Sequence, residues 1–303
     1  MKHLIPNSTS FETELPPTHL TGPIMNRQLR ITGLLIMFAV FLTWSSPASA
    51  VTIVDSIDGF GDAQYEFASG ANNSNASGTV VVSAGLVAPS GRSVYVEKTA
   101  GSNNVNLRVE ALDDDIDTAF SVSRASNIQG NVLLQWDGDT TDAGAPAAFN
   151  PLSNLSFLLG GGAGIDLTNG NALGILVRIL AADLAGQQLR ITLFGADATV
   201  ASEQLVNLPT VVPPGSFDAL FPFLGDGNND GFNDGFTLRA GAASTPNPNA
   251  IRAFTMSITG PTGSDLTIDL LGTYVPEPAT ASMFGFATLA VMARLRRRKP
   301  RSA

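Results

Sequence analysis

The chain contains no cysteine, and its only histidines are His3 and His19. The lack of cysteine excludes disulfides, thiol nucleophiles and thiolate metal sites. Everything after residue 24 also lacks imidazole, which excludes Ser-His-Asp and Cys-His catalysis, histidine acid–base chemistry and histidine-based zinc sites there. Aromatic residues make up only 7% of the chain. Without disulfides, stability must come from a hydrophobic core.

An N-terminal stretch has the three parts of a secretory signal peptide. Arg27 and Arg30 form a basic start, and an apolar run follows over residues 31–44. The small residues Ala48 and Ala50 then provide a small-x-small cleavage site. We therefore expect a signal peptidase to cleave after Ala50.

Such cleavage assigns residues 25–50 to the signal peptide and makes Val51 the first residue of the mature protein. Residues 1–24 are polar and contain proline, unlike the start of a signal peptide. We expect Met25 to be the true start and residues 1–24 to be an upstream extension. An unusually long basic region before the apolar run is the alternative, and it leaves the mature protein unchanged.

Residues 275–303 contain three features in a fixed order. Pro276, Glu277 and Pro278 come first, and an uncharged apolar run follows over residues 279–293. The chain then ends in a basic tail, whose cations are Arg294, Arg296, Arg297, Arg298, Lys299 and Arg301. The prolines predict an exposed, extended hinge, because proline cannot donate to a strand ladder and restricts the residue before it.

The apolar run at 279–293 can satisfy its own backbone in lipid only as a helix. At ~1.5 Å per residue it would rise ~23 Å, short of a ~30 Å hydrocarbon core. Snorkelling arginines or local thinning of the bilayer would have to make up the difference. Because basic residues stay in the cytoplasm, the preceding chain is expected to lie outside the inner membrane.

This order of features resembles the PEP-CTERM sorting signal, which consists of a Pro-Glu-Pro motif, a short membrane helix and an arginine-rich end. The resemblance is carried by Pro276, Glu277 and Pro278 with the run and the tail behind them, about a tenth of the chain. It implies that an exosortase cleaves near the motif, and that the released protein is associated with exopolysaccharide and biofilm. A tail anchor with an accidental Pro-Glu-Pro is the alternative.

The exported body, residues 51–274, is strongly acidic. It contains 8 basic and 23 acidic residues, a net charge near −15. Such a field repels nucleic acid and anionic membrane surfaces, and we exclude both as partners. It attracts divalent cations, although solubility outside the cell explains it without any ligand.

The body consists of short β-rich runs separated by Gly, Asn, Asp, Ser and Pro, which predicts eleven strands. They are 79–83, 93–98, 105–112, 119–124, 132–136, 173–180, 189–194, 203–208, 236–240, 251–259 and 266–271. Within 175–185 part of the chain could be helical, and 70–78 reads as a loop. The pattern predicts one all-β domain, an antiparallel two-sheet sandwich that is jelly-roll-like. A signal peptide precedes this domain, and a single C-terminal membrane helix follows it.

Period-two alternation predicts which side chains face the core. Two sets of residues show it most clearly: Phe254, Met256 and Ile258, and Leu266, Ile268 and Leu270.

A stretch rich in Asp, Asn and Gly resembles a calcium loop of the EF-hand type. The oxygen ligands at loop positions 1, 3, 5 and 9 would be Asp226, Asn228, Asp230 and Asp234. Gly231 stands at position 6, where the chain must turn tightly. Position 12, which normally carries a bidentate Glu, is Thr237, so the match is incomplete. Two Asn/Asp-Gly turns leading into a strand are the alternative interpretation.

Two further acidic clusters are weaker cation candidates, and solvated acidic loops are the simpler interpretation. They are Asp113, Asp114, Asp115 and Asp117, and Asp137, Asp139 and Asp142. Trp136, Tyr65 and Tyr95 could stack on sugars, but core packing is the simpler interpretation for these aromatics as well.

The sequence therefore predicts a non-enzymatic, exported protein of the cell surface or extracellular matrix. Its expected partners are signal peptidase, exosortase, the inner membrane before processing, and extracellular polysaccharide. A calcium-assisted carbohydrate-binding module is the first alternative. A polysaccharide hydrolase using two carboxylates is the second, although no pair of carboxylates has the sequence pattern of a glycosidase.

Overall fold

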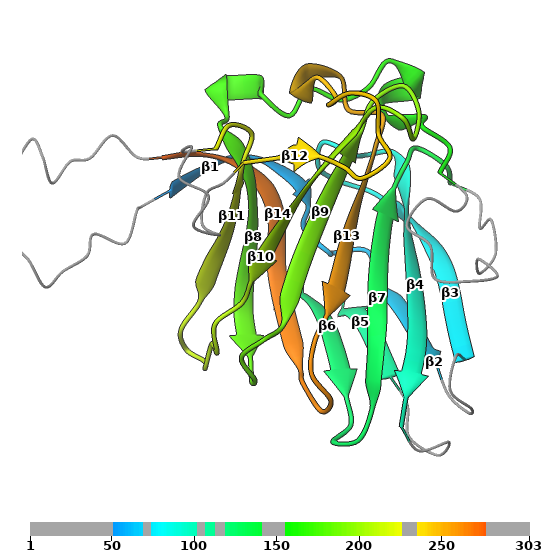
Figure 1. The fold of residues 1–303 in the computed structure, drawn as a ribbon, viewed down its shortest axis with the longest axis vertical. Coiled ribbons are helices and arrows are strands. Elements are labelled where there is room, and N and C mark those ends of the chain that lie inside the picture. The colour runs from blue at the N-terminus through cyan, green and yellow to red at the C-terminus, as the bar shows by residue number, and fades with distance from the viewer. Residues whose placement is uncertain are drawn as a thin grey trace, which may run out of the picture. The chain divides into compact units, whose positions relative to one another are not determined.

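The computed structural model describes residues 51–68, 74–101, 107–112, 119–140, 155–225 and 235–276. In these ranges the chain forms fourteen strands and three short 3-10 helices (Figure 1). The strands make two sheets in which all the paired strands run antiparallel. The predicted all-β class with two antiparallel sheets is confirmed.

The first sheet contains seven strands. In spatial order it runs through β11 (Phe217–Pro222), β8 (Gly174–Ala182), β14 (Leu266–Pro276), β6 (Ala119–Arg124), β5 (Leu107–Leu112) and β2 (Gln64–Ala68). The seventh strand, β1 (Val51–Asp58), pairs with β14. Since β6 pairs only with the start of β14, β1 takes the place beside the second half of that strand.

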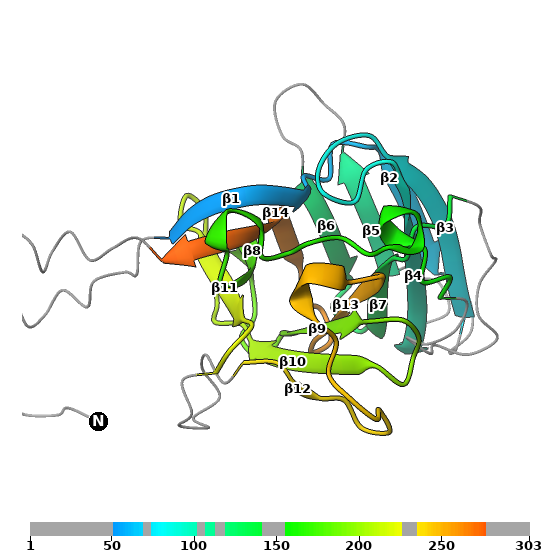
Figure 2. The ribbon, with the colours of Figure 1, turned by 90° about the horizontal axis from the view of Figure 1, so that it is seen from above.

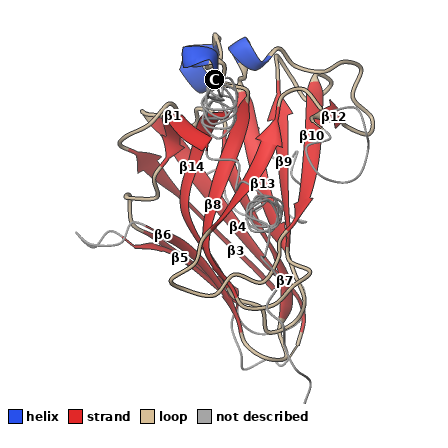
Figure 3. Cartoon of the chain, turned by 90° about the vertical axis from the view of Figure 1, so that its left-hand side faces the viewer, coloured by secondary structure: helices blue, strands red, loops and turns tan. Residues whose placement is uncertain are grey.

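The second sheet also contains seven strands. Its order is β12 (Thr237–Leu238), β10 (Ala201–Asn207), β9 (Gln188–Phe194), β13 (Ala253–Thr259), β7 (Gln129–Trp136), β4 (Ser90–Ala100) and β3 (Ser74–Val82). The 3-10 helices lie in loops at one end of the sandwich, drawn blue in Figure 3, and they are η1 (Leu159–Gly162), η2 (Asn169–Asn171) and η3 (Pro248–Ala250).

The core lies between the two sheets and is built from the inward-facing positions of the strands. Phe254, Met256 and Ile258 of β13 are all fully buried, as alternation predicts. Burying an aliphatic or aromatic side chain of this size stabilises a fold by about 1.5–3 kcal/mol, so this row of core residues makes β13 a central strand.

Each of the eleven predicted strands overlaps an observed one, but some details are wrong. The suggested helix within 175–185 is strand β8, and the loop expected at 70–78 gives way to β3 from Ser74 onward. The polar start of β3 is extended because it pairs along its whole length with β4. Strands β1, β2 and β11 were not predicted.

The alternation predicted for β14 fails at Leu270. The register between β14 and β8 shifts between Ile268 and Leu270, which moves the following residues to the other face. Leu271 is therefore fully buried, whereas Leu270 is only partly buried.

None of the helices in the described ranges is long and apolar enough to cross a membrane. The apolar runs at 31–44 and 279–293 lie outside those ranges, and so do the cleavage residues Ala48 and Ala50.

Candidate functional site

The first strand of the sandwich begins, and the last strand ends, at the same corner. Figure 2 shows β1 in blue beside the orange end of β14. In the antiparallel register Val51 lies opposite Pro276, Thr52 opposite Val275, and Ile53 opposite Tyr274. The predicted first residue of the mature protein and the first residue of the Pro-Glu-Pro motif are therefore direct neighbours.

Of the predicted sorting residues, the structure describes Pro276. It is the exposed last residue of β14, so the strand continues two residues beyond position 274. Proline is tolerated there because a terminal position does not have to donate to the ladder. Glu277, Pro278 and the basic tail lie outside the described residues.

A groove of about 680 Å³ opens beside this corner. Its apolar walls include Leu173, Phe223, Phe236, Tyr274 and Pro276, and none of its described lining residues is charged. The Phe223 and Phe236 rings stack with their centroids 6.3 Å apart. Because Phe223 follows β11 and Phe236 precedes β12, the groove joins segments from both sheets.

Backbone hydrogen bonds hold the groove walls in place. The amide N–H of Leu173 donates to the carbonyl of Tyr274 at 2.8 Å, and that of Phe223 donates to Leu173 at 2.8 Å. Leu224 and Gly235 form an isolated antiparallel bridge. At the other wall, Thr168 Oγ1 donates to Asn249 Oδ1 at 2.6 Å. The groove is therefore a preformed feature of the described fold.

Tyr274 fits the groove because a glycine faces it. A Cβ added at Gly174 would lie 2.7 Å from the Tyr274 ring and 2.5 Å from the Phe221 carbonyl oxygen. The Tyr274 side chain is only 4% exposed, and burial raises the pKa of its phenol to about 12. Burial thus favours the neutral phenol.

This pKa predicts a loss of stability in strong alkali. A raised folded pKa means that the contribution of Tyr274 is complete below pH 10.0, its unfolded value, and is lost as the pH rises toward about 12. We expect part of the fall in melting temperature over this window to disappear in Tyr274→Phe. The exposed Tyr65→Phe serves as the matched control, and an equal change in both variants would contradict the assignment.

The predicted calcium ligands Asp226, Asn228, Asp230 and Asp234 lie outside the described residues. At loop position 12, Thr237 begins β12, and its hydroxyl donates to the Glu203 carbonyl at 3.2 Å. Among the residues the structure describes, no three His, Cys, Asp or Glu side chains are grouped to hold a metal ion.

The acidic pair after β7 has a structural role. Asp137 is buried and accepts hydrogen bonds from Gln135 Nε2 at 3.0 Å and from the Ser156 amide at 2.8 Å. Asp139 Oδ2 accepts from Ser156 Oγ at 3.0 Å. Both carboxylates therefore tie the segment at 155–157 to the end of β7. Asp142 and the cluster at 113–117 are not among the described residues.

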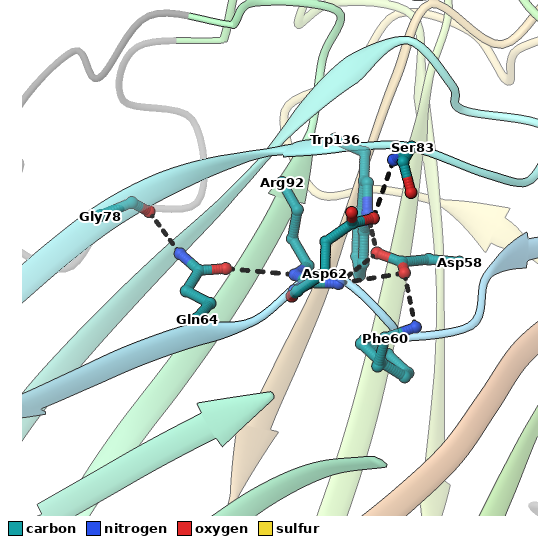
Figure 4. Close-up of polar contacts among 8 residues, drawn as sticks. All are labelled: Asp58, Phe60, Asp62, Gln64, Gly78, Ser83, Arg92 and Trp136. Carbon is teal, nitrogen blue, oxygen red and sulfur yellow. Dashed lines mark hydrogen bonds and ion pairs between the residues drawn. The ribbon is translucent and has the colours of Figure 1, made fainter. Parts of the chain in front are cut away.

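Trp136 belongs to a buried polar cluster that sequence reasoning did not predict (Figure 4). Its Nε1 donates to Asp58 Oδ2 at 2.9 Å, while Arg92 Nη1 approaches both Asp58 oxygens at 2.9 and 3.0 Å. The Phe60 amide donates to Asp58 Oδ1 at 2.8 Å. The cluster links β1 to β4 and β7 in the opposite sheet.

The three aromatics considered as sugar platforms have different environments. Trp136 is fully buried and stacks on Phe254 with a centroid distance of 4.6 Å, and Tyr95 is also buried. Both are core residues, as the simpler interpretation predicted. Tyr65 on β2 is 52% exposed.

No family model matches the chain, and no curated protein matches it. Among solved structures it is similar to the family 11 carbohydrate-binding module of a cellulosomal cellulase of Clostridium thermocellum, with 10% identity and a TM-score of 0.31. The match covers 75% of this chain and 95% of that module.

Two further likenesses are weaker. The enzymatically active domain of tailspike protein 4 of bacteriophage CBA120 gives 10% identity and a TM-score of 0.28, over 72% of this chain and 20% of that one. A structure from a study of promiscuous carbohydrate-binding modules of the β-sandwich superfamily gives 10% identity and a TM-score of 0.25, over 68% and 58%. Similarities of this size assign no activity to the chain.

Proposed function

We propose that the protein is an exported β-sandwich, anchored in the inner membrane by its C-terminal segment and then sorted to the cell surface or matrix by an exosortase. Its role there is structural or adhesive and non-enzymatic, in association with exopolysaccharide. The observation that carries this proposal is the pairing of Val51 with Pro276.

That pairing fits a protein processed at both ends. Cleavage after Ala50 leaves β1 intact, because the strand includes Val51, and cleavage behind Pro276 leaves β14 intact. Both cuts fall at one corner of the sandwich, so two membrane-bound proteases could act on a domain that is already folded. The two strands stay paired after both cuts, and the released body retains its fold.

The proposed non-enzymatic role is supported by how the buried carboxylates are used. Asp58 binds Arg92 and Trp136, and Asp137 binds Gln135 and the Ser156 amide. Both carboxylates therefore make structural contacts within the sandwich. The mature body also lacks the histidine and cysteine on which many hydrolases depend.

The orientation of the anchor provides a test. Replacing the six tail cations by glutamine should weaken the retention of the C-terminus in the cytoplasm, because basic residues keep that side inside. A reporter that is active only in the cytoplasm, fused after Ala303, measures this in cells. The matched control replaces the five arginines by lysine, which keeps the charge and should keep the topology. An unchanged reporter signal in the glutamine variant would contradict the charge-based orientation.

A calcium-assisted carbohydrate-binding module, jelly-roll-like in topology, is the second candidate. It is favoured by the preformed groove, whose lining includes Ser202 and Thr245 as well as the stacked Phe223 and Phe236. Aromatic faces beside hydroxyl groups suit a sugar ring. A glycan array with and without a chelator tests this candidate, and binding that the chelator abolishes would support it.

A further inference from the structure

The corner where β14 ends combines a short tether with an exposed apolar rim. We define the rim as Leu173, Phe223, Leu224 and Phe236. Leu224 is 86% exposed and Leu173 54% exposed, which is unusual for large apolar side chains that lie together. In a body with a net charge near −15, the groove behind this rim has no charged residue among its described lining.

The tether sets how far the rim can lie from the bilayer. Pro276 is held in β14 by its neighbours, and the predicted membrane span begins at position 279. Glu277 and Pro278 alone separate the two. A fully extended chain covers at most ~3.6 Å per residue, so the end of β14 lies within ~11 Å of the start of the span. The headgroup layer on one side of a bilayer is itself roughly 5–8 Å thick.

The groove is at the tethered end of the sandwich. Tyr274 pairs with Gly174 at the start of β8, and Pro222 pairs with the same residue from the other side. Leu173 and Phe223 directly adjoin these positions in the sequence. A tether of this length therefore keeps the rim within reach of the lipid interface, whereas the other end of β8 lies farther from the tether.

We propose that the rim rests on the interface of a zwitterionic bilayer as long as the C-terminal anchor is intact. This inference rests on the proposed function, because it needs the anchor. The rim is too small to hold the acidic body on a membrane by itself. The tether supplies a high effective concentration, which makes a weak contact persistent. Cleavage behind Pro276 removes the tether and releases the contact.

The contact also orients the domain. With the rim on the lipid, the corner that carries Val51 and Pro276 lies at the membrane surface, within reach of a membrane-bound protease. Asp55 and Asp166 near this end are engaged by Asn169 Nδ2 and by Thr168, respectively. These two described carboxylates are therefore held in hydrogen bonds, and the described lining of the groove behind the rim is uncharged.

Single-cysteine labelling tests the proposal cleanly, because the natural chain has no cysteine. Leu224→Cys places an environment-sensitive dye on the rim. Val212→Cys is the matched control, since Val212 is 69% exposed and follows Val211, which bridges to Ala182 at the far end of β8. Eight residue steps along that strand put the two labels roughly 26 Å apart.

The protein is purified from the membranes of an expression host without an exosortase, so that the anchor is kept, and is reconstituted in phosphatidylcholine vesicles with nitroxide-headgroup lipid. A rim that sinks into the interface should be quenched at least about twofold more strongly at position 224 than at 212. Leu173→Cys gives an independent second reading. The difference between positions should vanish after the chain is cut behind Pro276.

Three other results would overturn the proposal in different ways. Equal quenching at 224 and 212 in protein that floats with the vesicles refutes the contact but leaves the anchor standing. Protein that neither stays with membranes nor floats refutes both the contact and the proposed function. Shielding of the label at 224 that grows with protein density and brings no lipid quenching assigns the rim to a second copy of the chain.

Discussion

Replacing Asp58 by alanine should lower the free energy of unfolding by about 3–5 kcal/mol, because it breaks the buried ion pair with Arg92. The positive charge of Arg92 then stays buried without a negative partner. The Arg92 and Asp58 side chains are 0% and 1% exposed. The substitution also removes the acceptor of the Trp136 indole and of the Phe60 amide. The cluster holds the end of β1 against the second sheet, so β1 should loosen first.

A half-buried pair provides the control. Arg178 Nε and Asp218 Oδ1 lie 2.9 Å apart, but both side chains are about 30% exposed. Asp218→Ala should therefore cost less than about 1 kcal/mol. Urea unfolding followed by circular dichroism measures both variants, with Asp58→Asn as a milder change if alanine prevents folding. An equal decrease in the free energy of unfolding for Asp58→Ala and Asp218→Ala would show that burial does not increase the contribution of the Arg92–Asp58 pair to stability.

Saturating calcium should stabilise the protein by about 2.7 kcal/mol when the free ion is at a hundred times the dissociation constant. We attribute this to Asp226, Asn228, Asp230 and Asp234, because the three aspartate carboxylates repel one another without the cation. Since no bidentate ligand stands at loop position 12, the site should be weak, in the ~10⁻⁴–10⁻³ M range of extracellular modules. Asp230→Ala should abolish most of the gain.

The matched control for this variant is Asp197→Ala, which changes an exposed aspartate that accepts hydrogen bonds from Thr199 in another turn. It should keep the full response to calcium. The measurement is the melting temperature with calcium and with chelator. Identical melting of the wild type under both conditions would mean that the stretch forms turns only.

The strands with the clearest period-two pattern were predictable from the sequence. In β13 each inward residue is apolar, so the pattern reports burial directly. Strand β1 was missed although Val51, Ile53 and Val54 are β-branched, because it adjoins the signal peptide and contains two aspartates. Strand β11 is short and follows Pro213 and Pro214, which read as a loop.

The buried cluster and the groove could not be predicted in the same way. Asp58 and Arg92 are 34 residues apart, and no periodic pattern connects them. In the groove, Leu173, Phe223 and Tyr274 come together through the pairing of β8 with β11 and β14. Phe236 joins them next to the isolated bridge between Leu224 and Gly235. The predicted sorting signal is contiguous in the sequence, whereas the register of Pro276 with Val51 depends on the fold.

Mapping both ends of the mature protein by mass spectrometry tests the central claim most directly. Protein recovered from the surface or matrix of the native host should begin at Val51 and lack residues 294–303, because Val51 lies opposite Pro276 and both predicted cleavage sites fall just outside that pair. Intact peptides that cover 294–303 in extracellular material would contradict the account.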